Sequence, residues 1–539
     1  MQKKIALQLL PSEAANPIVI KQYLAQAAAV PEASITGYTL QKKSIDARSR
    51  QPLVNITATV FVNEPVVPVQ QLQPAYKDVS HAAKKVIVVG AGPCGLFAAL
   101  QLIELGIKPI VLERGKDVRS RRRDLAAMNK EGIVNPESNY CFGEGGAGTY
   151  SDGKLYTRSN KRGDINRILQ LLVYYGAPEA ITYESHPHIG TNKLPQIITQ
   201  MREKIIAQGG ELLFEKKLVD FTLEKDTIKK VVLSDGSEKT ADAVILATGH
   251  SARDVFFLLQ QKKLQIEAKP FALGVRIEHP QALIDSIQYH CQFNGLDKQA
   301  ITRDINLPAA SYSLVQQVNE RGVFSFCMCP GGIIAPAATN VREIVVNGWS
   351  PSKRNNPFAN SGMVVQIEIE EACRFLKKKD PATDAADPLL LLRFQQWVEQ
   401  QAYTAGGGKL VAPAQRMGDL VMNKQTGQLP DCSYLPGIKP VALNEVLPGF
   451  VFNSLQEGFK AFGKKMKGYL TNDAVVVATE SRTSSPVRIP RDAATLQHPQ
   501  VKNLYPAGEG AGYAGGIVSA AMDGEKLARQ IAAVWGIMV

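Results

Sequence analysis

The spacing of apolar residues changes character near residue 90. The stretch "KKVIVVGAGPCGLFAALQLIELGIKPIVLERG" opens with a continuous apolar run, Val86 to Val89, which is typical of a buried parallel strand. After a glycine-rich turn, apolar residues recur at helical spacing, at Leu96, Ala99, Leu100 and Ile103. A second apolar run, "KPIVLE", ends at Glu113. The pattern therefore predicts a strand, a tight turn, a helix and a second strand.

The spacing of apolar residues also predicts the secondary structure of three other regions. Residues 194–249 predict a helix, then a hairpin with an Asp-Gly turn and an apolar strand that ends in "ATG". The next stretch, of about 230 residues, holds strand-like segments such as "FALGVRIEHPQ" and one helical pattern, "PLLLLRFQQWVEQQAYT". Residues 1 to 80 suggest a small β-α-β-β unit, which could brace the body or carry a partner, and a proline-containing linker.

These patterns predict an α/β protein whose nucleotide-binding domain is interrupted by an insertion. The expected segments are a small α+β N-terminal domain (1–66), a linker (67–83), a first part of a Rossmann-like domain (84–252), a substrate or cap domain with a mixed or antiparallel sheet (253–480), and a second part of the Rossmann-like domain (481–539).

Composition adds an expectation about compartment and partners. Hydrophobic residues make up 45% and charged residues 21%, as in ordinary globular proteins. No stretch approaches the roughly 18 consecutive apolar residues of a membrane span, and seven scattered cysteines indicate a reducing compartment, so we expect a cytoplasmic protein. The net charge of +12 favours anionic partners. However, the basic residues are dispersed apart from "RSRRRD", which makes nucleic acid a less favoured partner.

The first glycine run has the spacing GxGxxG. Gly90 permits the turn, Gly92 lets the backbone approach a pyrophosphate, and Gly95 lets the helix lie close to the strand. The amides at the start of that helix can face the phosphates, and Glu113 can accept hydrogen bonds from ribose hydroxyls. A dinucleotide site is therefore predicted, but these residues do not distinguish FAD from NAD.

A second GxGxxG, Gly510 to Gly515, occurs in "GEGAGYAGG" near the C-terminus. Only 24 residues follow Gly515, fewer than the roughly 30 residues of a βαβ unit, and no strand ending in an acid follows. We therefore predict that "KNLYPAG" is a final strand beside the first one. The two glycine runs then build one site from opposite ends of the chain.

Several motifs together resemble an uncharacterised bacterial family of FAD-dependent dehydrogenases in the glutathione-reductase-like superfamily. They are "VIVVGAGPCGLFAALQL", "FGEGGAGTYSDGKL", "HPHIGTNKL", "FALGVRIEHPQ", "FSFCMCPGG", "ESRTSSPVRI" and "LYPAGEGAGYAGGIVSAAMDG". The resemblance extends from about Lys85 to the C-terminus. It implies FAD as the cofactor and a glutathione-reductase-like FAD-binding domain, and it does not identify a substrate.

The turn residues and this resemblance together give a set of expected FAD contacts. An arginine after Glu113 is expected to clamp the pyrophosphate, although a solvated helix surface is an equal alternative for any single one. Glu509 departs from the more usual aspartate of the superfamily. The full set is Gly90, Gly92, Pro93, Cys94, Gly95, Glu113, Arg114, Arg122, Gly145, Gly146, Ala147, Gly148, Leu218, Ala247, Thr248, Gly249, Gly508, Glu509, Gly515, Gly516 and Ile517.

Two cysteines are candidates for catalysis. Cys327 and Cys329 occupy alternate positions of an extended stretch, so their side chains are expected on one face. A reactive thiol pair near the flavin and buried structural cysteines remain open alternatives. No second Cys/His pair completes a zinc site, and no metal is expected.

Histidines and arginines supply the other candidates. His250 follows "ATG" and is a candidate proton donor, as are His186, His188 and His279. Arg276 and Arg482 are expected to bind a carboxylate-like anion, because the guanidinium fork suits that task.

The leading hypothesis is a flavoprotein oxidoreductase that transfers a hydride between flavin N5 and an unidentified small molecule, with an anionic substrate as one option. Between residues 160 and 500 no second nucleotide motif appears, so NAD(P)H could dock only transiently. The alternatives are an FAD-dependent RNA-modifying enzyme and a non-catalytic FAD-binding or sensing protein. The sequence does not indicate an oligomeric state.

Overall fold

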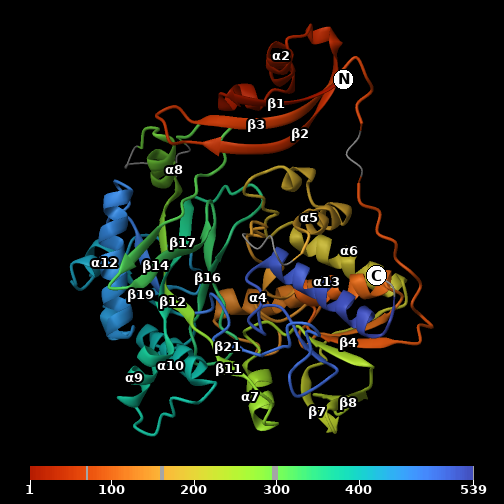
Figure 1. Cartoon of the computed structure of the whole chain (residues 1–539). Helices are drawn as coiled ribbons and strands as arrows, with labels where there is room; N and C mark the ends of the chain where they lie inside the picture. Colours follow the sequence, from red (N-terminus) through yellow and green to blue (C-terminus); the bar gives the residue numbers. More distant parts are fainter. Residues whose placement is uncertain (68–70, 158–162, 294–301, 538–539) are drawn as a thin grey trace.

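The computed structural model describes residues 1–67, 71–157, 163–293 and 302–537, and its elements form three units (Figure 1). The N-terminal unit is an antiparallel sheet of order β1-β3-β2 with two short helices on one face. Ile5, Leu24 and Ile56 are among its buried core residues. Its elements are β1 (Gln2–Leu9), α1 (Pro11–Ala14), α2 (Pro17–Ala28), a 3-10 turn (Glu32–Ser34), β2 (Ile35–Asp46) and β3 (Leu53–Val62).

The second unit, called here the parallel-sheet unit (residues 84–268 and 484–537), contains the predicted strand, turn, helix and strand. Its five strands are all parallel, in the order β22-β10-β4-β5-β6. They are β4 (Lys85–Val89), β5 (Lys108–Leu112), β6 (Glu211–Leu213), β10 (Ala243–Leu246) and β22 (Leu504–Pro506). The strand from "KNLYPAG" lies at the edge of this sheet and pairs with β10, which separates it from β4. The predicted position directly beside the first strand is therefore wrong, because an apolar run indicates a strand but not which strand of the sheet it pairs with.

Both faces of this sheet are covered, as the continuous apolar strands require. Val86 and Val88 of β4 face a core shared with α3 (Pro93–Glu104), α5 (Ile165–Tyr174), α6 (Leu194–Ala207) and α13 (Ile517–Val534). Ile87 and Val89 face the opposite core. That core is shared with α7 (Arg253–Gln261) and with a hairpin sheet of β7 (Leu218–Glu224), β8 (Thr227–Leu233) and β9 (Glu238–Lys239).

The third unit, the mixed-sheet unit (residues 271–483), has a seven-stranded sheet of order β13-β14-β17-β12-β20-β18-β19. All neighbours are antiparallel except β18 and β19, which agrees with the expected mixed sheet. The strands are β12 (Phe271–Pro280), β13 (Val315–Val318), β14 (Arg321–Cys329), β17 (Phe358–Ile367), β18 (Ala412–Arg416), β19 (Ile438–Pro440) and β20 (Val475–Glu480).

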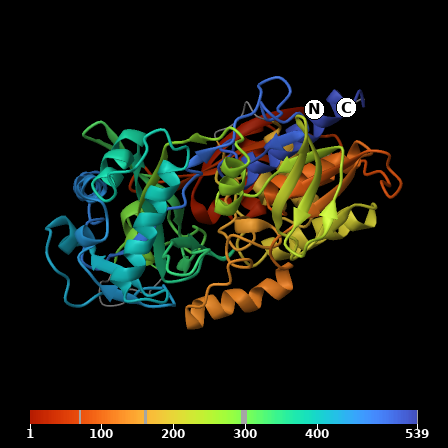
Figure 2. The ribbon, with the colours of Figure 1, turned by 90° about the horizontal axis from the view of Figure 1, so that it is seen from below.

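Helices and a small hairpin complete this unit. Seen from below, the mixed-sheet unit lies beside the parallel-sheet unit (Figure 2). The helices are α8 (Gln281–Tyr289), α9 (Ile369–Lys377), α10 (Leu390–Gly406), α11 (Met417–Val421), α12 (Gly449–Lys465) and a 3-10 turn (Leu443–Glu445), and the hairpin strands are β15 (Ile333–Pro336) and β16 (Val346–Trp349). Between the units, β11 (Glu267–Ala268) pairs with β21 (Val487–Arg488).

The structure moves one expected boundary. The break predicted between residues 252 and 253 lies instead near residue 269, because α7 packs into the core of the parallel-sheet unit through Val255, Phe256 and Leu259. The sequence shows that α7 has an apolar face, but the pattern cannot tell which sheet that face covers.

The edge strand of the N-terminal unit is attached to the body of the protein. The Lys43 N–H donates to the Tyr183 carbonyl (2.8 Å), and the Lys43 carbonyl accepts from the Ser185 N–H (3.0 Å). In the turn between β2 and β3, the Ala47 carbonyl lies 3.2 Å from His290 Nε2, at the end of α8. The unit therefore touches both larger units, a position suited to a brace. Within the described residues, no helix is long and apolar enough to cross a membrane.

Candidate functional site

A cavity of about 950 Å³ lies where the parallel-sheet and mixed-sheet units meet. Its walls come from both ends of the chain, since Gly90 and Gly92 line it together with Gly508, Gly515 and Gly516. The glycine loop that includes the 3-10 turn Gly146–Gly148 forms another wall. The mixed-sheet unit closes the cavity with the end of β14 and with β15 and β16.

The first glycine turn has the shape that the spacing predicts. Gly90 has a φ of +108°, and an added Cβ would lie 2.4 Å from the Ala247 carbonyl oxygen. A Cβ on Gly95 would lie 1.9 Å from the Gly90 carbonyl oxygen, so both glycines are required by close backbone approach. In contrast, a Cβ on Gly92 would meet nothing nearer than 4.0 Å, because this position faces the cavity.

The start of α3 is open toward the cavity. Gly92 is the N-cap of this helix and offers no side chain to its first amides. Unpaired amides at a helix N-terminus attract an anion. The turn can therefore receive a phosphate, which is the group that a dinucleotide presents there.

Glu113 is buried and ties two loops together. One oxygen accepts from Ala91 N–H (2.9 Å), and the other accepts from Gly115 and Gly143 N–H (both 2.9 Å). Glu113 also lines the cavity, and its contact with a ribose stays a prediction. Its three amide partners show a second role, which is to join the first glycine turn to the loop around Gly143.

The arginine that organises this region is Arg121 and not Arg122. Arg121 is fully buried and donates to the carbonyls of Asn139 (2.7 Å) and Tyr140 (2.9 Å). Two further bonds reach the Glu144 (3.0 Å) and Gly146 (2.9 Å) carbonyls. Its donors therefore hold the glycine loop and are not free for a pyrophosphate. Arg122 is exposed and does not line the cavity, because it lies on the outer face of α4 (Val118–Glu131).

Eighteen of the twenty-one predicted contact residues line the cavity. Besides Arg122, Gly95 and Gly145 do not. Gly95 lies behind the turn, and Gly145 shapes the loop with a φ of +76°. The residues that do line the cavity are Gly90, Gly92, Pro93, Cys94, Glu113, Arg114, Gly146, Ala147, Gly148, Leu218, Ala247, Thr248, Gly249, Gly508, Glu509, Gly515, Gly516 and Ile517.

We expect Arg121→Met to weaken cofactor binding by roughly 100-fold or more, because four loop carbonyls lose their donors. Arg122→Met is the matched control and is expected to leave affinity within about twofold, as for an exposed side chain. Titration of the apo-protein with FAD measures both. Equal effects of the two substitutions on FAD affinity would contradict the role given to Arg121 in holding the glycine loop.

Cys327 and Cys329 line the cavity at the end of β14, where a bulge interrupts the pairing with β17. Cys327 has a φ of +45°, so the extended geometry that predicted two side chains on one face is broken there. Cys329 Sγ lies 3.5 Å from both Lys154 Nζ and Arg276 Nη2. The Cys327 side chain is exposed to the cavity, and the protein packed around it raises its pKa to about 11, so that group is a neutral thiol near pH 7.

His250 and Glu509 face each other in the cavity wall. His250 Nε2 lies 3.2 Å from the Arg482 carbonyl, which can only accept, so Nε2 carries a hydrogen. Nδ1 lies 3.2 Å from Glu509 Oε2. Burial raises the pKa of Glu509, but bonding to His250 outweighs it and leaves the pKa lowered. The lowered pKa keeps Glu509 ionised near pH 7.

The other oxygen of Glu509 accepts from the Gly516 N–H at the start of α13. The structure shows that Glu509 already supplies a negative charge there.

The two arginines expected to bind an anion are both occupied. Arg276 is fully buried, does not line the cavity, and pairs with Glu480 (2.7 Å) and Asn360 (2.7 Å). Arg482 lines the cavity, but its guanidinium bonds to Thr339 (2.7 Å) and to two buried carboxylates. Neither guanidinium fork is left for a substrate anion, because acids distant in sequence neutralise both.

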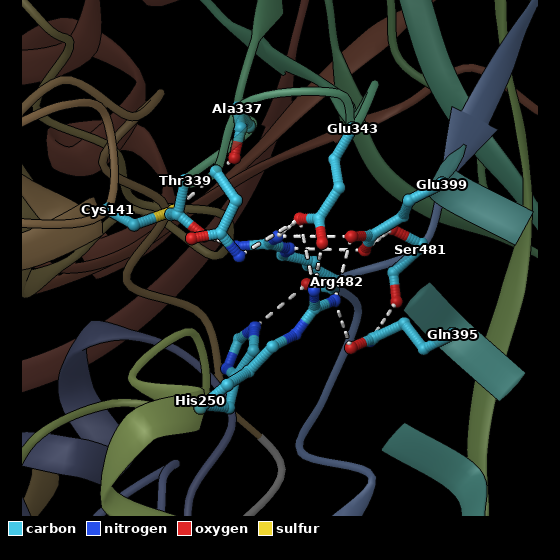
Figure 3. A network of polar contacts seen from close by, with 11 residues as sticks. Cys141, His250, Ala337, Thr339, Glu343, Gln395, Glu399, Ser481 and Arg482 are labelled. Carbon is cyan, nitrogen blue, oxygen red and sulfur yellow. Dashed lines mark hydrogen bonds and ion pairs between the residues drawn. The ribbon is translucent and has the colours of Figure 1, made fainter. Parts of the chain in front are cut away.

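Arg482 belongs to a buried cluster of four charges (Figure 3). Arg253 of α7 pairs with Glu343 (3.0 Å) and with Glu399 of α10 (2.8 Å). Arg482 pairs with the same two carboxylates, at 3.3 and 3.2 Å. Ser481 Oγ also donates to Glu399 (2.6 Å). The cluster joins α7 to the mixed-sheet unit and lies directly behind His250.

The remaining candidate histidines lie in three different environments. His186 lines the cavity against the ring of Tyr156. His188 lies 3.2 Å from the Ser352 carbonyl, and burial lowers its pKa. His279 is fully buried with a pKa lowered by burial to about 4, so it is a structural residue of β12. Sequence reasoning overlooked Lys154, although it stands in the quoted loop "SDGKL" and lines the cavity.

Comparisons with known proteins agree with this geometry. A family described as "FAD binding domain" matches residues 83–131, one described as "FAD-dependent protein, C-terminal domain-like" matches residues 270–483, and a "Domain of unknown function" matches residues 1–61. Two solved structures show weak likeness. CtdE in complex with FAD has 11% identity, a TM-score of 0.32 and coverage of 83% of this chain and 85% of the other. The 2,6-dihydroxypyridine-3-hydroxylase from Arthrobacter nicotinovorans has 12% identity, a TM-score of 0.34 and 84% coverage of both chains.

Fold, site and family matches together define an FAD-binding protein. An uncharacterized protein from Clostridium beijerinckii is 39% identical over 508 residues, which is 91% of each chain. The chain belongs to the same family as that protein.

Proposed function

We propose that this protein is an FAD-dependent oxidoreductase that acts on a small molecule bound on the mixed-sheet side of the cavity. The observation that carries the proposal is that one cavity is shared by the glycine loops of the parallel-sheet unit and by residues of the mixed-sheet unit. When bound, FAD supplies hydride acceptance or donation at N5. A protein that only retained FAD would not need the part of the cavity that lies beyond the glycine loops, against the mixed-sheet unit.

Different residues of the chain would have different roles, according to where they lie in the cavity. Gly92 and the open start of α3 receive the phosphates, and Arg121 keeps the glycine loop in shape against the cofactor. His250 and Glu509 lie against each other at the cavity wall. Cys327, Tyr312 and Trp349 line the part of the wall that the mixed-sheet unit provides. These groups would enclose the substrate and exclude water from it.

The finer assignment to a glutathione-reductase-like arrangement also belongs to this proposal. It is supported by the parallel sheet with its hairpin sheet β7-β8-β9 between β6 and β10. The described residues form one GxGxxG strand-turn-helix site, which FAD would occupy. We therefore propose that electrons are exchanged with a small molecule, or with NAD(P)H that docks transiently and has no separate site of this kind.

Purified protein is expected to carry FAD, or to take it up, and to show the visible absorption band of oxidised flavin. The band should disappear on anaerobic reduction with dithionite and return on admission of an electron acceptor such as ferricyanide or oxygen. Anaerobic mixing with NADH or NADPH then tests transient docking. A folded protein that shows no flavin band after incubation with FAD would overturn the proposal.

A further inference from the structure

The ammonium group of Lys154 lies on the cavity wall, beside a carboxylate that a second cation also uses. Nζ lies 3.5 Å from Cys329 Sγ and 3.4 Å from Asp152 Oδ2. The Lys154 side chain is one third exposed, and the residue lines the cavity. A backbone bridge between Lys154 and His188 fixes its position at the end of the glycine loop.

Asp152 cannot neutralise Lys154 alone, because it is shared. The same Oδ2 accepts from Arg354 Nη2 at 2.9 Å. Among the described residues that line the cavity, Lys154 and Arg354 both pair with this carboxylate. Two cations thus share one carboxylate, and this part of the wall carries a surplus of positive charge.

Neighbouring groups keep Lys154 protonated. Burial lowers the pKa of Lys154, but Cys329 and the Asp152 carboxylate more than offset that effect, so the pKa is raised. Behind Cys329, Arg276 is neutralised by Glu480 and has no direct access to the cavity. Arg276 is therefore unavailable to a ligand, whereas the ammonium of Lys154 lines the cavity.

We propose that Lys154 binds a carboxylate of the substrate, which assigns the substrate of the proposed oxidoreductase to the carboxylic acids. This inference rests on the proposed function. One ammonium offers up to three donors and a single charge, which suits a monoanion. A cation inside an enclosed cavity also attracts an anion more strongly than an exposed lysine does.

The test uses the FAD-loaded protein and two probes of the same shape, benzoate and its neutral analogue benzamide. Isothermal titration calorimetry gives both affinities, and the visible flavin spectrum reports binding beside the cofactor. Wild type is expected to bind benzoate about tenfold more tightly than benzamide, as for one charge-assisted hydrogen bond. Lys154→Met should remove that preference and leave benzamide binding unchanged, while Lys154→Arg should restore most of it.

Lys353→Met is the matched control, because Lys353 is an exposed lysine close in sequence to Arg354 and does not line the cavity. It should keep the wild-type preference. The proposal is overturned if wild type does not prefer benzoate, if Lys154→Met keeps the preference, or if that variant loses FAD and so assigns Lys154 to the cofactor. Failure of the proposed function would appear earlier and separately, as the absence of a flavin band in wild type.

Discussion

Replacing Gly92 by aspartate is expected to weaken FAD binding strongly while the protein still folds. Gly92 has an extended backbone (φ −75°, ψ −177°) that any residue can adopt, and its added Cβ would meet nothing nearer than 4.0 Å. It is also the N-cap of α3, a position where aspartate is preferred over glycine by a few tenths of a kcal/mol. The new carboxylate would occupy the amides that the pyrophosphate needs and would repel its charge.

We expect the dissociation constant of FAD to rise at least roughly 100-fold, equivalent to about 2.7 kcal/mol. Gly92→Asn is the matched control, because it has nearly the same size and cap geometry without the charge, and it should give a smaller loss. Flavin fluorescence on titration of the apo-protein measures the affinity, and thermal unfolding of the apo-protein measures stability. Wild-type affinity in Gly92→Asp would show that the phosphate does not lie at this turn.

Glu399→Gln is expected to destabilise the protein by about 3 kcal/mol, because it leaves two buried guanidinium groups with one carboxylate. Glu399 is fully buried and pairs with Arg253 and Arg482. For a unit of this size the loss corresponds to a fall in Tm of roughly 10 °C. Thermal unfolding followed by circular dichroism measures it.

Glu457→Gln is the matched control, since the Lys460–Glu457 pair lies at the surface with half-exposed side chains, and its loss should change Tm by no more than about 2 °C. A Glu399→Gln effect of that same size would contradict the role given to the buried cluster.

The stability difference between wild type and Glu399→Gln should also depend on pH. Burial raises the pKa of Glu399, but Arg253 and Arg482 outweigh it and lower the pKa to about 2, from an ordinary value of 4.5. A carboxyl group whose pKa is lower in the folded state adds stability above its unfolded pKa and loses it as the pH falls toward the folded pKa. The difference should therefore be full at pH 7 and shrink between about pH 4.5 and pH 2.

The nucleotide-binding half of the molecule was the most predictable from sequence. Strand, turn, helix and strand follow from residues adjacent in the chain, and the structure has them at β4, α3 and β5. The late glycine run was also predicted to join the first one, because too little chain follows Gly515 for a separate unit. Both runs line one cavity. The α7 boundary was misplaced, because an amphipathic pattern does not name the surface that its helix covers.

Charged side chains were the least predictable part of the site. Arg122, Arg276 and Arg482 were expected to face ligands, whereas the structure leaves the first in solvent and pairs the other two with the protein's own acids. Arg482 meets Glu343 and Glu399, which are 139 and 83 residues away in the chain. No local pattern signals such a pairing, since an ion pair leaves no periodicity in the sequence.

The sequence by itself determined the backbone of the cofactor site, because close approaches demand glycine and buried strands demand continuous apolar runs, and both are local requirements. FAD as the cofactor was implied by the resemblance of the ordered motifs to a known family, and the family matches support it. Only the tertiary structure decided which charges are already neutralised and which remain available. That outcome depends on distances between side chains brought together from separate units, and it singles out Lys154 among the cations of the cavity.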